Sequence, residues 1–60
     1  MTRRLVYELI VNWLKGAVSF IDSDMEKMEP RVRGIAFQCR EAMAQLAITV
    51  DELRTAIEDD

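Results

Sequence analysis

The sequence has no histidine, one cysteine and only two glycines among its 60 residues. A single cysteine cannot form an internal disulfide, and without histidine a structural zinc site is not expected. Gly16 and Gly34 are isolated, so the chain lacks a glycine-rich loop that could bind phosphates. The sequence therefore predicts no enzyme activity, no metal and no cofactor.

The size and charge of the chain limit the classes of fold and function that remain. Residues 1–60 make one small domain, and chains of this size bury only about 60% of their unfolded surface, so many need oligomerisation to stay folded. The composition is globular, and the net charge of −3 argues against general nucleic-acid binding. Glu8, Asn12 and Lys15 interrupt the first apolar segment, so we expect neither a signal peptide nor a membrane span. A cytoplasmic location follows.

The second half of the chain carries the strongest pattern. Apolar or small residues recur there at alternating spacings of four and three: Val32, Ala36, Cys39, Met43, Leu46, Val50, Leu53 and Ile57. This repeat is the seam of an α-helix that packs lengthwise against other helices, and we interpret Cys39 as a small core residue within it. Pro30 is well placed to open this helix, which we predict over residues 30–58.

The first half predicts a second helix, over about residues 2–22, with Thr2 as its N-cap. Its apolar residues form two parallel rows: Tyr7, Val11, Leu14, Val18 and Ile21 in one, and Val6, Ile10, Trp13, Ala17 and Phe20 in the other. The apolar face is therefore wider than contact with one neighbouring helix requires. We expect Trp13, at its centre, to be a core residue.

Signals compete in the predicted connection, residues 23–29. Ser23 to Glu26 resembles a capping box, whereas Met25 and Met28 continue the repeat of the first helix. The alternative is a short helical turn within the connection, with a kink at Pro30. Charges favour an antiparallel hairpin, because that arrangement sets acidic residues near basic ones at both ends: Asp22, Asp24 and Glu26 near Arg31 and Arg33, and Arg3 and Arg4 near Asp51 and Glu52.

The predicted helices are about 30 and 43 Å long, so two turns of the second, carrying Leu53 and Ile57, should extend past the first. Phe37, Ala44 and Ile48 form a further stripe away from the seam. One hairpin cannot cover all of these surfaces. The predicted fold is therefore an all-α antiparallel helical hairpin that dimerises into a four-helix bundle. Its oligomer core includes Leu46, Val50, Leu53 and Ile57.

Two functional hypotheses follow. The first is a non-enzymatic protein-interaction module, such as a phage- or plasmid-encoded regulator, inhibitor or adaptor, that binds another protein through Phe37, Ala44 and Ile48. The alternative is a helical bundle that binds a nucleotide or RNA through Arg31, Arg33 and Arg40 in the second helix. A dimerisation fragment of a larger protein is a third interpretation, although Met1 and the acidic end favour a whole protein.

Two helices and a short turn in about 60 residues resemble the Rop family of plasmid-encoded hairpin proteins, which regulate RNA and dimerise into four-helix bundles. The resemblance lies in length and heptad pattern. No shared motif carries that family's RNA-binding residues onto positions of this sequence, so the resemblance implies a fold and not a function.

Overall fold

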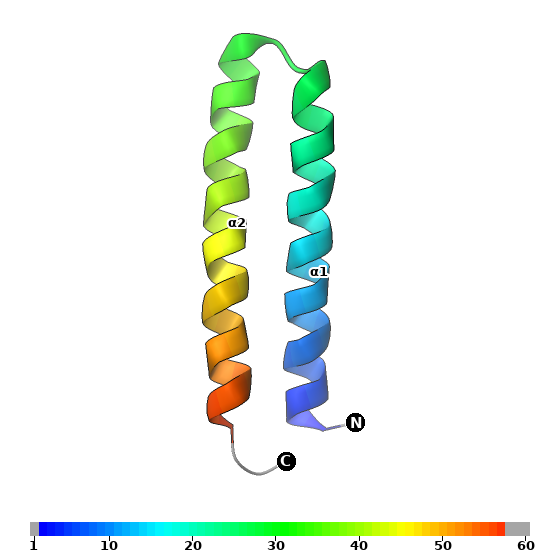
Figure 1. Ribbon diagram of the computed structural model, residues 1–60, viewed down its shortest axis with the longest axis vertical. Coiled ribbons are helices and arrows are strands. Elements are labelled where there is room, and N and C mark those ends of the chain that lie inside the picture. Colours follow the sequence, from blue (N-terminus) through cyan, green and yellow to red (C-terminus); the bar gives the residue numbers. More distant parts are fainter. Residues whose placement is uncertain (1, 58–60) are drawn as a thin grey trace.

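The computed structural model, which describes residues 2–57, is an antiparallel helical hairpin (Figure 1). Helix α1 spans Arg3–Asp24, a single 3₁₀ turn η1 spans Met25–Lys27, and α2 spans Pro30–Ala56. The described residues contain no strand, and the hairpin measures 46 × 16 × 9 Å along its principal axes. The predicted all-α hairpin is confirmed.

Both helices begin where the sequence predicts. Thr2 has an extended backbone, and its hydroxyl oxygen accepts a hydrogen bond from the Leu5 N–H at 3.2 Å, which satisfies one of the free donors of the first turn. Glu29 is also extended, because the ring of Pro30 disfavours helical geometry in the preceding residue. Pro30 then occupies the first turn of α2, where its missing N–H costs nothing.

The connection is shorter than the predicted range 23–29. Helix α1 continues to Asp24, so Ser23 lies inside the helix and the suggested capping box does not form. The short helical turn considered as an alternative is present as η1, without a kink at Pro30. Arg33 holds this turn from α2: its Nε donates to the Met25 carbonyl at 3.1 Å, and its Nη2 donates to the Met28 carbonyl at 2.8 Å.

The interface between the helices is narrow. Among the described residues, only Val11, Leu14 and Ala47 are buried. The flanking inward positions are half-buried: Tyr7, Val18 and Ile21 on α1, and Ala36, Arg40, Met43, Val50 and Arg54 on α2. The first apolar row predicted for α1 therefore faces α2, as its spacing indicates.

The predicted seam of α2 does not face α1 along its whole length. Cys39, Leu46 and Leu53 are exposed, whereas the next residue in each case, Arg40, Ala47 or Arg54, turns toward α1. Ala47 is small enough for close helix packing. Arg40 and Arg54 cover apolar surface with their methylene stems while their charged heads reach carboxylates.

Two further expectations are corrected by the structure. The predicted two-turn overhang of α2 is absent, because η1 lengthens the first arm and the two helices finish level at the open end (Figure 1). The expected grouping of acidic residues with Arg31 and Arg33 at the turn holds only in part: Glu26 and Arg33 line the same shallow pocket, whereas Asp22 pairs elsewhere. Asp22 lies 3.0 Å from the Nε of Arg40, Arg31 contacts Glu29 at 3.7 Å, and Arg33 binds backbone carbonyls.

Candidate interaction surfaces

About half of the large apolar side chains in the described residues are exposed to solvent. One group of them directly precedes the inward-facing positions in the sequence: Val6, Ile10, Trp13 and Phe20 on α1, and Ile35, Leu46 and Leu53 on α2. We call this group, with the smaller Ala17, Cys39 and Ala42 between its members, the broad apolar face. Trp13, predicted to be core, is 69% exposed in the single hairpin, and Phe20 is 68% exposed.

These residues lie on one side of the hairpin because of helix geometry. A residue that precedes an inward position is rotated from it by about 100° in the α-helix. The rotation has opposite senses in space for two antiparallel helices, so it brings both rows to the same side of the plane that contains the two axes. The broad apolar face therefore runs along both helices.

The elongated shape of the hairpin leaves much of its surface uncovered. The chain exposes 4622 Å², whereas a compact folded monomer of 6.9 kDa exposes about 4,000 Å². The excess of roughly 600 Å² includes polar as well as apolar surface and follows from the dimensions of 46 × 16 × 9 Å.

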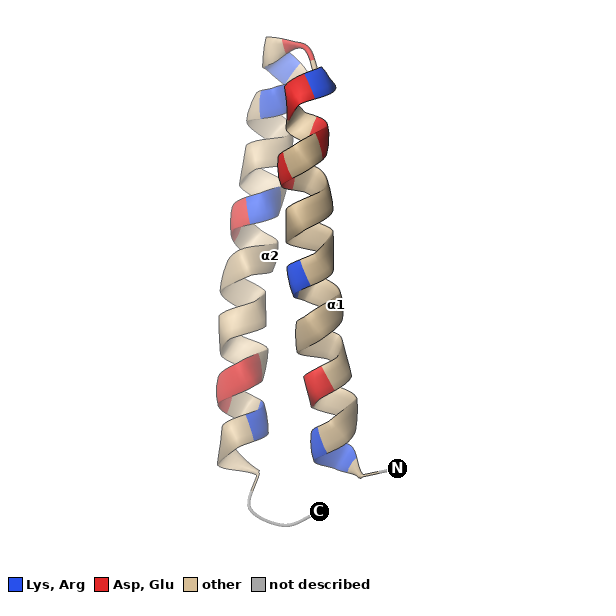
Figure 2. Ribbon diagram, turned by 45° about the vertical axis from the view of Figure 1, so that its right-hand side comes forward, with Lys and Arg blue, Asp and Glu red and all other residues tan. Residues whose placement is uncertain are grey.

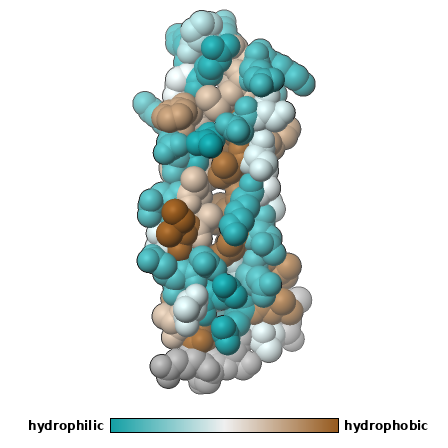
Figure 3. All heavy atoms as spheres, in the orientation of Figure 1, coloured by the Kyte–Doolittle hydropathy of each residue, from teal (hydrophilic) through white to brown (hydrophobic). Residues whose placement is uncertain are grey.

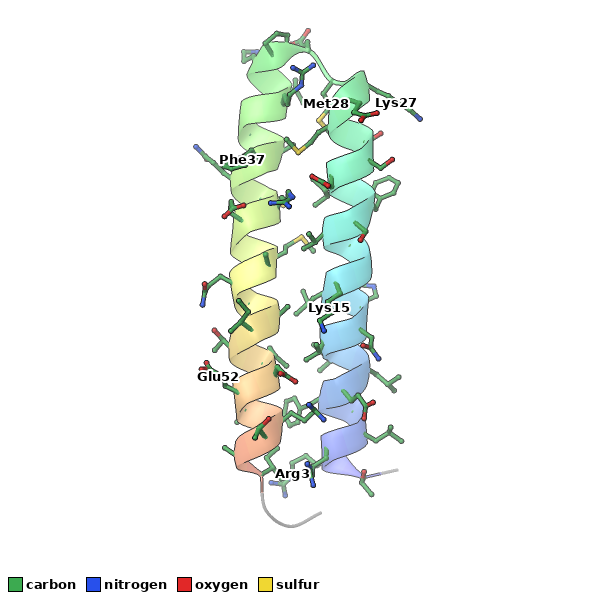
Figure 4. The ribbon with its side chains drawn as sticks, viewed as in Figure 1. Arg3, Lys15, Lys27, Met28, Phe37 and Glu52 are labelled. Atoms are coloured by element: carbon green, nitrogen blue, oxygen red, sulfur yellow. The ribbon has the colours of Figure 1, made fainter. Side chains whose placement is uncertain are left out.

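The other side of the hairpin is mainly polar. Its residues follow the inward positions: Glu8, Asn12, Lys15, Ser19 and Asp22 on α1, and Phe37, Ala44, Ile48, Asp51 and Thr55 on α2. Figure 3 shows this side as largely hydrophilic, with a brown apolar patch over α2, and Figure 4 shows Lys15 and Phe37 in the same view.

The predicted partner-binding residues lie on this polar side. Phe37 and Ile48 are 51% and 55% exposed, and the smaller Ala44 between them is half-buried. We call these three residues the Phe37 stripe. Ala44 and Ile48 line one wall of a shallow groove of about 460 Å³, and Lys15, Val18 and Ser19 of α1 line the other. The groove ends at Asp51 and Glu52.

The three arginines proposed for phosphate binding do not act together. Arg31 pairs with Glu29, and Arg33 donates to backbone carbonyls of the turn. Arg40 donates from Nη1 to Glu41 at 2.7 Å, and its Nε lies 3.0 Å from Asp22 without the alignment of a hydrogen bond. Figure 2 shows acidic residues close to these arginines near the turn. Each guanidinium group is thus engaged by a different part of the chain.

We next consider metal ligands, membrane spans and the cysteine thiol in the described residues. No cluster of acidic or cysteine side chains in residues 2–57 has the arrangement of a metal site. Neither described helix has the length and hydropathy of a membrane span. The Cys39 thiol lies 3.9 Å from the Met43 sulfur, one turn along the same helix, and is otherwise an exposed residue of the broad apolar face.

Comparison with known proteins does not indicate a family or a function for this chain. No family model, no curated protein and no solved structure matches this chain.

Proposed function

We propose that this chain is a non-enzymatic protein-interaction module that works as a homodimer. The broad apolar faces of two copies pack together into a four-helix bundle, and the Phe37 stripe stays outside and binds another protein. The observation that carries this proposal is the broad apolar face itself, which runs along both helices and includes a largely exposed tryptophan and phenylalanine. Contiguous apolar surfaces of this extent are rare on soluble monomers and mark association sites.

The direction of the α2 seam supports a second hairpin as the occupant of this face. Val32, Ala36, Met43 and Val50 of the seam are half-buried next to α1, whereas Cys39, Leu46 and Leu53 belong to the broad apolar face. The centre of the seam therefore points between α1 and the broad apolar face. A helix in a four-helix bundle has neighbours on both of these sides, and its seam points toward the bundle axis.

The Phe37 stripe remains accessible in such a dimer. Its residues come directly after the inward positions of α2 in the sequence, which places them on the side of the hairpin opposite the broad apolar face. Phe37 lines a separate shallow hollow near the turn with Pro30 and Gln38, and large aromatic side chains are common anchors of protein interfaces. The carboxylates of Asp51 and Glu52 border the groove beside Ala44 and Ile48. These features favour a protein partner with an apolar side chain for the groove and basic residues around it.

The alternative function, nucleotide or RNA binding through Arg31, Arg33 and Arg40, has less support. A phosphate would compete with the contacts that each arginine already makes within the chain. Absorbance near 260 nm in the purified protein, removed by nuclease or high salt, would favour this alternative over the protein-interaction module.

Leu46→Asp and Ile48→Asp form a matched pair that tests the proposal. The two side chains are 49% and 55% exposed and lie two residues apart on opposite sides of the hairpin. Light scattering coupled to size-exclusion chromatography should show a dimer for the parent and for Ile48→Asp. Leu46→Asp should be monomeric or lose helicity, because it places a charge in the bundle core.

The same pair gives clear contrary results. If Leu46→Asp keeps both the mass and the helicity of the parent, the broad apolar face is not an interface. If Ile48→Asp also dissociates the dimer, both faces of the hairpin take part in self-association. The assignment of the Phe37 stripe to an outside partner is then wrong.

A further inference from the structure

We infer that the turn of this hairpin is a hinge with two states. In the closed state the chain is the observed hairpin, and in the open state α1 and α2 join into one continuous helix. Pro30 and Arg33 hold the hinge closed. The inference rests on the geometry of the turn and does not depend on the proposed homodimer.

Of residues 25–29, Met28 and Glu29 alone depart from helical geometry. Met25 is helical, with φ of −59° and ψ of −28°, and η1 continues to Lys27. The φ angles of Met28 and Glu29 are −94° and −70°, in or near the helical range. Their ψ angles are 150° and 158°, whereas an α-helix has ψ of about −42°. The rotation of two ψ angles therefore separates the hairpin from a helix over residues 3–56.

The local sequence before Pro30 favours the continuous helix. Residues 25–29 are Met, Glu, Lys, Met and Glu, all of which have high helix propensity. Met25 and Met28 also continue the apolar repeat of α1. Local propensity therefore does not explain why the helix is interrupted at Met28 and Glu29.

Pro30 opposes the open state at one position. In a continuous helix its nitrogen would face the carbonyl of Glu26, to which it has no N–H to donate, and its ring would clash with that carbonyl. A proline inside a helix disfavours the helical state by about 100-fold or more. At the start of α2 the same residue costs nothing, because an N–H in the first turn has no intrahelical acceptor.

Arg33 opposes the open state at two more positions, because its side chain binds carbonyls that a continuous helix needs. Its Nε donates to the Met25 carbonyl at 3.1 Å, and its Nη2 donates to the Met28 carbonyl at 2.8 Å. In a continuous helix the Met25 carbonyl would accept from the N–H of Glu29, and the Met28 carbonyl from the N–H of Val32. The closed hinge thus replaces two backbone hydrogen bonds with two charge-assisted bonds from one guanidinium group.

A second copy can preserve the packing of α1 on α2 in the open state. Asp22 is level with Arg40, and Lys15 lies beside Ala47 in the groove, so level residues are equally far from Arg31 along the chain. Two continuous helices that run antiparallel, with their Arg31 positions level, repeat this register. In this pair α1 of each copy packs on α2 of the other, and the contact is symmetric, as an isologous dimer requires.

The packing between the helices therefore does not select the hairpin, because both states keep it. The selection lies in the turn. Exchange of identical elements between copies is a common result of changes in hinge loops, and here Pro30 and Arg33 are the residues that prevent it.

Removal of both residues should open the hinge. The test variant is Pro30→Ala combined with Arg33→Ala, and the matched control is Arg31→Ala, which removes an exposed arginine paired with Glu29 at 3.7 Å. Donor and acceptor dyes on Glu8→Cys and Thr55→Cys, in a Cys39→Ala background, report the distance between the two ends of one chain. An excess of unlabelled chain of the same variant ensures that each assembly carries one labelled copy.

We expect the parent and the control to stay closed and the double variant to open. In the closed state the dyes lie within about 30 Å, because packed helices are about 10 Å apart, and energy transfer is efficient. In the open state they lie about 70 Å apart along one helix, and energy transfer is almost lost. In small-angle X-ray scattering, the longest dimension should rise from near 46 Å to about 80 Å, with helicity at least that of the parent.

Two results for the double variant would overturn the inference. Efficient energy transfer with an unchanged longest dimension means that Pro30 and Arg33 do not hold the hinge closed. Lost energy transfer with reduced helicity means that the chain unfolds instead of forming a continuous helix. Neither result bears on the proposed homodimer, which Leu46→Asp and Ile48→Asp test separately.

Discussion

Replacing Trp13 by alanine should weaken self-association far more than it weakens the hairpin. Trp13 is 69% exposed in the single chain, so its truncation removes few contacts within one copy. An aromatic side chain presents about 150–250 Å² to be buried, of which the exposed part of Trp13 is about 100–170 Å². At about 25 cal/mol per Å², complete burial of this part would contribute about 2.5–4 kcal/mol for each copy.

A dimer contains this side chain twice, and Trp13 lies toward the edge of the proposed interface, where half of its exposed part can stay in water. Half of the full value still amounts to about 3 kcal/mol per dimer, which is more than 100-fold in the dissociation constant. The monomeric hairpin, by contrast, should lose less than about 1 kcal/mol of unfolding free energy, because surface substitutions have small effects.

Sedimentation equilibrium gives the dissociation constant, and circular dichroism at the same concentrations gives the helicity. Phe37→Ala is the matched control, since Phe37 is an aromatic residue of α2 with 51% exposure on the opposite side of the hairpin. The control should leave the dissociation constant nearly unchanged. If Trp13→Ala also leaves it unchanged, or if both variants weaken association equally, the broad apolar face is not the dimer interface.

Three further predictions concern single positions. Phe37→Asp should leave helix content and melting temperature nearly unchanged while abolishing binding of the outside partner, and a loss of the helical signal would show that Phe37 is a core residue. Gly16→Ala should raise the unfolding free energy by about 0.5–1 kcal/mol in denaturant titrations, since a Cβ there meets no atom within 4 Å; destabilisation would indicate a helix crossing at Gly16. Thr2→Ala should lower the melting temperature through loss of about 0.5–2 kcal/mol of capping, whereas Thr2→Ser should not.

The first residues of both helices were predictable because local chemistry decides where a helix begins. Thr2 supplies a cap, and Pro30 fixes the backbone of Glu29 and opens α2. The connection was harder to predict, because Ser23 carries a capping signal while Met25 continues the apolar repeat of α1. The structure resolves this competition through Arg33, whose hydrogen bonds to the turn come from the next helix and leave no signal in the local sequence.

The faces of the helices were predictable only in part. The two apolar rows of α1 are both present, one facing α2 and one exposed. On α2, periodicity identified Leu46 and Leu53 as seam residues, yet the single hairpin turns Ala47 and Arg54 toward α1 instead. A heptad pattern records the direction in which all neighbours of a helix lie, and it does not separate neighbours within one chain from those in another.

The candidate site was predictable to a similar extent. Exposure of Phe37 and Ile48 agrees with their angular distance from the seam. The separate engagement of Arg31 and Arg40 could not be predicted, because it depends on the rotamers of long side chains and on the register of Asp22 against α2. The broad apolar face is the surface that needed the structure, since only the packing of α1 on α2 shows what stays uncovered.

Sedimentation equilibrium of the unmodified chain, over concentrations from below one micromolar to hundreds of micromolar, tests whether the hairpin is a dimer. We expect a helical species of twice the 6.9 kDa mass that dissociates only on dilution. Parallel circular dichroism should show that helicity falls as the dimer dissociates. A species that stays at 6.9 kDa and fully helical at the highest concentrations would contradict the proposed dimer, because the hairpin would then be stable in water with its broad apolar face uncovered.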